Sequence, residues 1–166
     1  MSAKRPLFRA AWEASQRVYD SADPGAKVAA IVGGKVAANI APTGKWTNTC
    51  AVRISYILNQ TGTLVPYGAG KTVSGADKRW YFYYVRDVIA FLRKTWGEPD
   101  LVIAYPPSGG GDLAKKQGLV LFEVAGWSDA AGHATLWDGL SCYDHCYFNE
   151  PGARYRTDRA NFWALK

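Results

Sequence analysis

Long apolar runs are missing from this sequence. No stretch approaches the roughly 20 apolar residues that a membrane-spanning helix needs, so we expect no insertion into a membrane. Residues 1–19 carry charge but have neither the apolar core nor the cleavage site of a signal peptide. Internal repeats and low-complexity segments are also missing. These features argue against an integral membrane protein, a repeat array and export through a signal peptide.

Blocks of basic residues are missing too. The chain has 20 Lys and Arg against 14 Asp and Glu, a net charge of +6, but its basic residues are scattered. The charge favours an anionic partner, which could be nucleic acid, a membrane surface or a bacterial cell wall. Nucleic-acid binding is not predicted, because no basic stretch is interleaved with aromatic residues.

What the sequence contains is sufficient for a folded domain. Its 166 residues are 48% hydrophobic and 20% charged, which argues against disorder. This length can bury a core, and we expect a single domain over residues 1–166. The 17 glycines and the 14% aromatic content indicate turns and strands rather than a helix bundle.

The N-terminal half shows helical periodicity. Residues 7–19 are expected to form a short helix, whereas residues 20–45 are expected to form a loop or short strands around Gly33 and Gly34. A longer helix is predicted to be capped by Asn48 and to end at Gly62.

Beyond residues 64–80, which are expected to be irregular, another helix is predicted at about 84–96. The period then changes to that of strands. Residues 119–127 and 133–139 are predicted to form an antiparallel pair, and a late run, 161–165, to close the sheet. Helices followed by an antiparallel sheet indicate an α+β domain.

The cysteine of "NTCAVRISYILNQTG" is the first candidate for chemistry. Cys50 is expected at the second position of its helix, where free backbone N–H groups lower the pKa of a thiol. A cysteine nucleophile also needs a base. Of the two histidines, His133 opens a strand after a hairpin, whereas His145 lies between two cysteines. The order of cysteine, histidine and acid matches the papain-like arrangement. The alternative is that Cys50 is a core residue and that His133 is structural.

An acid could orient His133. Asp138 precedes a glycine and is better suited to a turn, whereas Asp144 could return beside the strand. Asp144 lies between Cys142 and Cys146, which leaves three alternatives for this pair. The two cysteines could form a disulfide that holds the loop in place, a zinc site with His145, or two free thiols. The zinc site lacks a fourth ligand nearby.

These segments resemble a known family. "VGGKV", "NTCAVRISYILNQTG", "GLVLFEVAGWSDAAGHATLWDG" and "CYDHC" are together similar to the fourth family of type VI secretion amidase effectors. The effectors of this family are antibacterial toxins related to the NlpC/P60 cysteine peptidases. The matching segments run in the same order from about Gly33 to Cys146.

The resemblance implies a fold, an activity and a site. It implies a papain-like NlpC/P60 domain that hydrolyses the amide between the γ-carboxyl of D-glutamate and meso-diaminopimelate in peptidoglycan stem peptides. Cys50 would be the nucleophile, His133 the base and Asp144 the group that orients it, with a disulfide between Cys142 and Cys146. The oxyanion would be held by backbone N–H groups that include that of Cys50. No cofactor or metal is implied.

The resemblance also implies partners and a location. The effector would be made in the producer cytoplasm, exported by the type VI secretion apparatus, and active in the periplasm of the target cell. A cognate immunity protein would block its active-site cleft. A close cysteine pair suits an oxidising compartment.

Aromatic residues near the expected site include Trp46, Trp127 and Trp137. They are candidates for the wall of a substrate groove, but core packing is the favoured interpretation for at least two of the three. Two other functions remain possible from the residues. One is a papain-like hydrolase or transacylase that acts on another acyl substrate. The other is a non-catalytic module that binds the cell wall.

Overall fold

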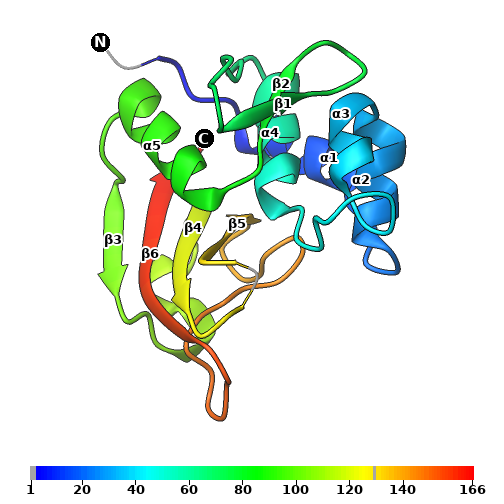
Figure 1. The fold of residues 1–166 in the computed structure, drawn as a ribbon. Coiled ribbons are helices and arrows are strands. Elements are labelled where there is room, and N and C mark those ends of the chain that lie inside the picture. Colours follow the sequence, from blue (N-terminus) through cyan, green and yellow to red (C-terminus); the bar gives the residue numbers. More distant parts are fainter. Residues whose placement is uncertain (1–2, 129) are drawn as a thin grey trace.

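The computed structural model describes residues 3–128 and 130–166, and its helices and strands separate in space (Figure 1). Helices α1 to α4 lie on one side and the larger sheet on the other, with α5 above the sheet. Within the described residues the elements are α1 (Phe8–Val18), α2 (Pro24–Val32), α3 (Gly34–Asn39), α4 (Cys50–Gln60), β1 (Thr72–Ser74), β2 (Trp80–Phe82), α5 (Val85–Trp96), β3 (Leu101–Ala104), the 3-10 segment η1 (Ser108–Leu113), β4 (Gly118–Ala125), β5 (Gly132–Trp137) and β6 (Arg156–Ala164). The expected α+β class is confirmed.

The larger sheet is antiparallel, and β4 lies near its middle. In the described parts of the chain it has four strands in the order β3-β6-β4-β5. Alternate side chains of β4 point to opposite faces. Leu119 and Leu121 enter the larger apolar cluster, on the helix side, whereas Val120 and Phe122 enter a smaller one. β4 is therefore apolar on both faces, and its register with β5 places His133 opposite Phe122.

Helix α4 is buried along almost its whole length, from Cys50 to Asn59. It packs against α1, β2 and β5. A helix that is enclosed on all sides must be apolar all round or must pair its polar groups. Ser55 illustrates the second case, because its hydroxyl donates to the Ala51 carbonyl and accepts the backbone N–H of Phe82. The core therefore holds the segment that begins with Cys50 rigidly.

Residues 20–45 were expected to form a loop or short strands, and this expectation is wrong. They contain α2 and α3. Asp23 caps α2 by accepting the backbone N–H of Ala26, and proline occupies the first helical position. Gly33, with a φ of 63°, separates the two helices. A Cβ on Gly34 would lie 2.6 Å from the backbone nitrogen of Ala76, so glycine is required for close packing there.

The helices expected at residues 7–19 and 84–96 are confirmed as α1 and α5, and the predicted strand pair is confirmed as β4 and β5. The segment 64–80 is only partly irregular, because it contains β1 and the start of β2. The late run is part of β6, which lies between β3 and β4 instead of at an edge. None of the helices in the described residues has the length and apolar character that a membrane crossing requires.

Candidate active site

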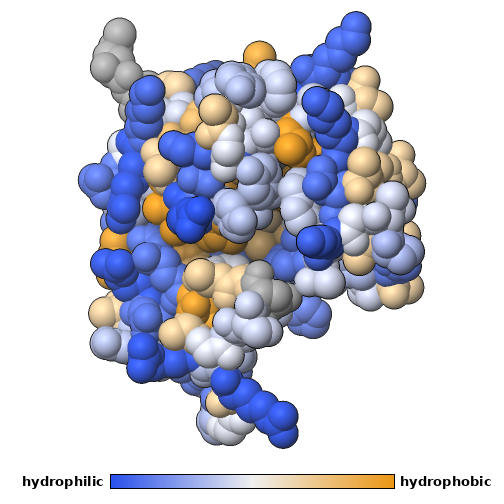
Figure 2. Space-filling view, viewed as in Figure 1, coloured by the Kyte–Doolittle hydropathy of each residue, from blue (hydrophilic) through white to orange (hydrophobic). Residues whose placement is uncertain are grey.

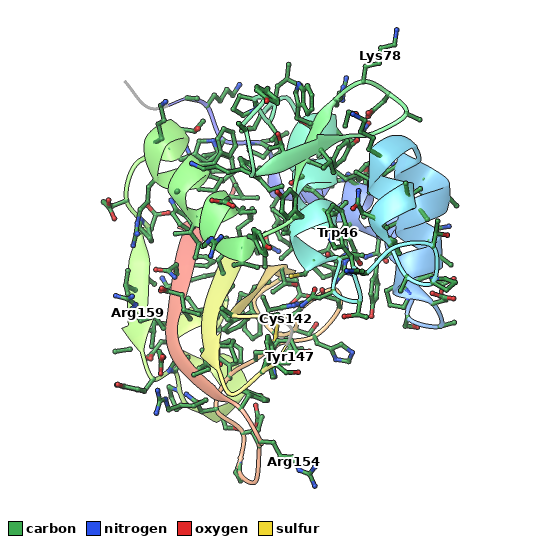
Figure 3. All side chains as sticks on the ribbon, viewed as in Figure 1. Trp46, Lys78, Cys142, Tyr147, Arg154 and Arg159 are labelled. Atoms are coloured by element: carbon green, nitrogen blue, oxygen red, sulfur yellow. A yellow bond between two sulfur atoms is a disulfide. The ribbon has the colours of Figure 1, made fainter. Side chains whose placement is uncertain are left out.

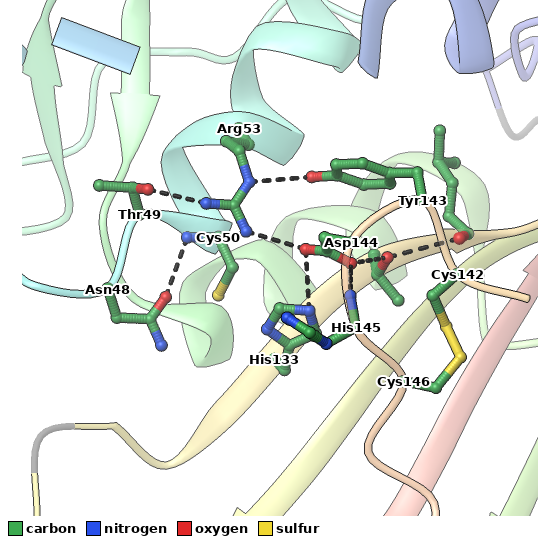
Figure 4. Close-up of polar contacts among 12 residues, drawn as sticks. Asn48, Thr49, Cys50, Arg53, His133, Cys142, Tyr143, Asp144, His145 and Cys146 are labelled. Atoms are coloured by element: carbon green, nitrogen blue, oxygen red, sulfur yellow. Dashed lines mark hydrogen bonds and ion pairs between the residues drawn. A yellow bond between two sulfur atoms is a disulfide. The ribbon is translucent and has the colours of Figure 1, made fainter. Parts of the chain in front are cut away.

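Cys50 is the first residue of α4 and not the second, because Thr49 and not Asn48 is the N-cap residue. The Asn48 side chain instead accepts the backbone N–H of Cys50 through Oδ1 at 3.0 Å (Figure 4). Cys50 is a free cysteine and is only 2% exposed. Its thiol lies at the positive end of a helix, in contact with the imidazole of His133.

His133 stands in the second position of β5 and reaches the thiol from the sheet. Its Nε2 lies 3.0 Å from Oδ2 of Asp144, which leaves Nδ1 for Cys50. The ring is buried, and Tyr147 packs against it with the ring centroids 4.7 Å apart. Thiol, imidazole and carboxylate therefore form a continuous series of contacts.

Asp144 is the acid that reaches His133. Its side chain is 1% exposed, and both of its carboxylate oxygens have polar partners. Its Oδ1 accepts the Thr135 hydroxyl at 2.6 Å and the backbone N–H of His145 at 2.7 Å. Burial alone would raise the pKa of Asp144, but attraction to His133 and Arg53 holds it well below its usual range. Asp138 forms a turn, as expected, because its Oδ1 accepts the backbone N–H groups of Leu140 and Ser141.

The electrostatics favour a charged cysteine–histidine pair. Burial would raise the pKa of Cys50, but His133 and, to a lesser degree, Arg53 lower it below its ordinary value. Burial would lower the pKa of His133, but Asp144 and Cys50 raise it to about 9. A thiolate beside an imidazolium is the resting state that a cysteine nucleophile requires.

Arg53 is a residue that the sequence interpretation missed. Its guanidinium donates to Asp144 Oδ2 at 2.8 Å, to the Tyr143 hydroxyl at 3.1 Å and to Thr49 Oγ1 at 2.8 Å. The guanidinium also lies over the ring of Tyr19. Two features of the sequence could have revealed it: an arginine inside an apolar helix, and its place one turn after Cys50, on the same face.

The disulfide between Cys142 and Cys146 is present and encloses Asp144. The zinc site and the pair of free thiols are therefore wrong, because the two sulfur atoms are bonded to each other. His145 contributes only its backbone to Asp144. In the described part of the chain, no group of three or more His, Cys, Asp or Glu side chains could hold a metal ion.

A groove of about 730 Å³ passes beside Cys50. Figure 2 shows a hollow with an apolar floor between polar walls near the centre of the molecule. Trp46 and Trp127 line the groove. In Figure 3, Trp46 lies on the α4 side and Tyr147 on the sheet side.

The expected role of Trp137 in the groove is wrong. Its side chain is 2% exposed, and its indole N–H donates to the Leu113 carbonyl within the smaller apolar cluster. The expectation of core packing for at least two of the three tryptophans is also wrong, because Trp46 and Trp127 line the groove and only Trp137 is enclosed in the core.

His133 and Trp137 share one face of β5, because residues four positions apart in a strand point the same way. What separates them is their position along the strand. His133 lies at the end next to Cys50, whereas Trp137 lies at the far end, where Phe148 packs against it. Core packing is therefore what the structure assigns to Trp137.

The chain is similar to known proteins in sequence and in fold. Residues 46–163 match the sequence profile of type VI secretion system (T6SS) amidase effector protein 4, Tae4. A search of curated proteins gives no match. The crystal structure of the type VI effector Tae4 from Enterobacter cloacae is 39% identical, with a TM-score of 0.86 and full coverage of both chains.

Two effector–immunity complexes are also similar. The Tae4-Tai4 complex from Enterobacter cloacae is 39% identical, with a TM-score of 0.87, and the one from Salmonella Typhimurium is 36% identical, with a TM-score of 0.85. In both cases 98% of this chain and all of the other chain are covered. The chain belongs to the Tae4 family of type VI secretion amidase effectors.

Proposed function

We propose that residues 1–166 form one amidase domain that hydrolyses the amide between the γ-carboxyl of D-glutamate and meso-diaminopimelate in peptidoglycan stem peptides. Cys50 is the nucleophile, His133 the base and Asp144 the group that orients the base. The observation that carries this proposal is the buried series of contacts from thiol to imidazole to carboxylate beside a groove.

The reaction proceeds in two halves. The Cys50 thiolate attacks the γ-glutamyl carbonyl carbon, and the C–N bond breaks as His133 donates its proton to the leaving amine of diaminopimelate. A thioester remains on Cys50. His133 then takes a proton from water, the hydroxide attacks the thioester, and the thiolate leaves. Asp144 holds the imidazole in the orientation that both halves need.

The Asn48 side chain occupies the N–H group that is expected to stabilise the oxyanion. The backbone N–H of Cys50 is the expected oxyanion donor, but it donates to Asn48 Oδ1 in this structure. A substrate carbonyl oxygen must therefore replace the Asn48 side chain at this N–H before the tetrahedral intermediate can be stabilised.

The proposal includes partners and a compartment. The similar structures from Enterobacter cloacae and Salmonella Typhimurium contain Tae4 bound to Tai4, so a cognate immunity protein is expected to cover the groove of this chain. The disulfide beside Asp144 suits the oxidising periplasm of a target cell. The type VI apparatus would deliver the protein there.

Mass spectrometry of purified diaminopimelate-type sacculi tests the function. Digestion with the wild-type protein should convert tetrapeptide muropeptides to dipeptide ones, and Cys50→Ala should leave them intact, because no thiolate remains to form the thioester. Circular dichroism should show the same fold for both proteins. Unchanged muropeptides with the folded wild type would reject this substrate. Equal cleavage by Cys50→Ala would reject the nucleophile.

The pH dependence of the reaction follows from the site. The reactive state needs Cys50 as thiolate and His133 protonated, so kcat/KM should fall as the pH rises past about 9, where His133 loses its proton. At the acid end it should fall only below the ordinary thiol range, because the pKa of Cys50 is lowered. Initial rates on a defined stem peptide at a series of pH values check this. His145→Gln should leave the profile unchanged, and a basic limb near the ordinary histidine value of about 6.5 would contradict the prediction.

A further inference from the structure

The groove beside Cys50 is lined with more positive than negative charge. Lys45, Arg86 and Arg93 line it together with one carboxylate of the described residues, that of Glu123. Glu123 is neutralised by Arg159, whose Nε lies 2.9 Å from its Oε2. The groove is therefore suited to an anionic ligand.

Two of these cations share one face of α5. Arg86 and Arg93 are seven residues apart, which is close to two turns and about 10 Å along the axis. Ile89 lies between them, also lines the groove, and is mostly buried. This wall therefore offers a cation at each end of an apolar surface, which suits a methylene chain that carries carboxylates.

Arg86 is the better prepared of the two. Its guanidinium lies over the ring of Tyr84, 4.6 Å from the centroid, and stacking of this kind leaves the N–H edge of the guanidinium open. Across residues 3–128 and 130–166, no carboxylate lies within ion-pair distance of Arg86. Arg93, by contrast, contacts Glu98 at 3.2 Å. Arg86 is thus oriented but not neutralised.

The position of Arg86 in α5 also favours an anionic ligand. It lies in the first turn, at the positive end of the helix dipole, where Asp87 is the acidic residue and no side chain caps the backbone N–H groups. The helix dipole does not stabilise a cation at this end, whereas the dipole and the charge of Arg86 would both attract an anion bound there. The charge, the stacking and the helix end thus point to the same class of ligand.

We propose that Arg86 binds a free carboxylate of the stem peptide next to the scissile amide, a proposal that rests on the function proposed above. In γ-linked D-glutamate the α-carboxyl is not used in the peptide link and remains ionised. Diaminopimelate carries a second free carboxylate at its far end. Both carboxylates are joined to the scissile amide by short methylene chains, and the planar guanidinium can bind either in a bidentate manner.

The test compares enzyme and substrate variants together. Wild type, Arg86→Gln and Arg154→Gln are assayed for kcat/KM on three defined stem peptides. One is unmodified, one has the glutamate α-carboxyl as an amide, and one has the free diaminopimelate carboxyl as an amide. Arg154→Gln is the control for net charge, because Arg154 is exposed and projects away from the groove in Figure 3.

Arg86→Gln should lower kcat/KM on the unmodified peptide by about ten- to a hundredfold, the range for a hydrogen bond to a charged group. Arg154→Gln should have no such effect. On one of the amidated peptides wild type should lose the same factor and Arg86→Gln should lose nothing further, which identifies the carboxylate. If Arg86→Gln has a kcat/KM lower than that of wild type by the same factor on all three peptides, Arg86 does not contact either carboxylate. Failure of the wild type to cleave any of them would overturn the proposed function itself.

Discussion

Replacing His133 with glutamine is expected to lower kcat/KM for stem-peptide hydrolysis by about a hundred- to ten-thousandfold, the usual contribution of a general acid–base group. Glutamine can neither accept the Cys50 proton nor donate one to the leaving amine. It also removes the cation that lowers the pKa of Cys50, so less thiolate is present near pH 7. Stem-peptide kinetics measure the first effect, and the rate of iodoacetamide modification of Cys50 measures the second.

His145→Gln is the matched control for this variant. It changes the other histidine of the chain, whose contact with Asp144 is made by its backbone and is kept. We expect wild-type kinetics and wild-type thiol reactivity from it. Rapid modification of Cys50 in His133→Gln would show that the imidazole does not activate the thiol, and the assignment of His133 would then fail.

Replacing Arg53 with methionine is expected to lower the free energy of unfolding by about 3–5 kcal/mol, the range for breaking a buried ion pair by removing one partner. The side chains of Arg53 and Asp144 are 6% and 1% exposed, so water cannot replace the lost contact. The pKa of Asp144 should rise, because one of the charges that lower it is gone. Urea denaturation measures the stability, and the acid limb of the activity profile should move to higher pH, because Arg53 also lowers the pKa of Cys50.

Two further variants test whether the ion pair between Arg53 and Asp144 is the source of this effect. Arg9→Met removes an exposed arginine from an ion pair with Glu13 and should change the stability by about 0.5 kcal/mol or less. The double variant Arg53→Met with Asp144→Leu should be less destabilised than the sum of its two single variants, because no charge is then left buried and unpaired. Strict additivity would show that the ion pair is not the source of the effect.

Local patterns in the sequence were sufficient for the elements that repeat at a regular spacing. The apolar periodicity of α5 and the glycine after it predicted that helix, and the β-rich runs on either side of a turn predicted β4 and β5. Their formation depends on contacts between neighbours in the chain or across one hairpin. The segment with α2 and α3 was wrongly predicted, because its glycine, alanine and proline content indicated a loop or short strands, whereas Asp23 caps a helix there.

The sequence by itself determined the chemistry that is available: a cysteine at a helix start, a histidine at a strand start and an acid within a cysteine pair. Only the tertiary structure decided which groups meet. It brought Arg53 to Asp144, 91 residues away, and placed Trp137 in the core. Such contacts join elements that are distant in the chain, and they arise from the way α4 packs on the sheet. No local spacing records that packing, because it depends on the whole core.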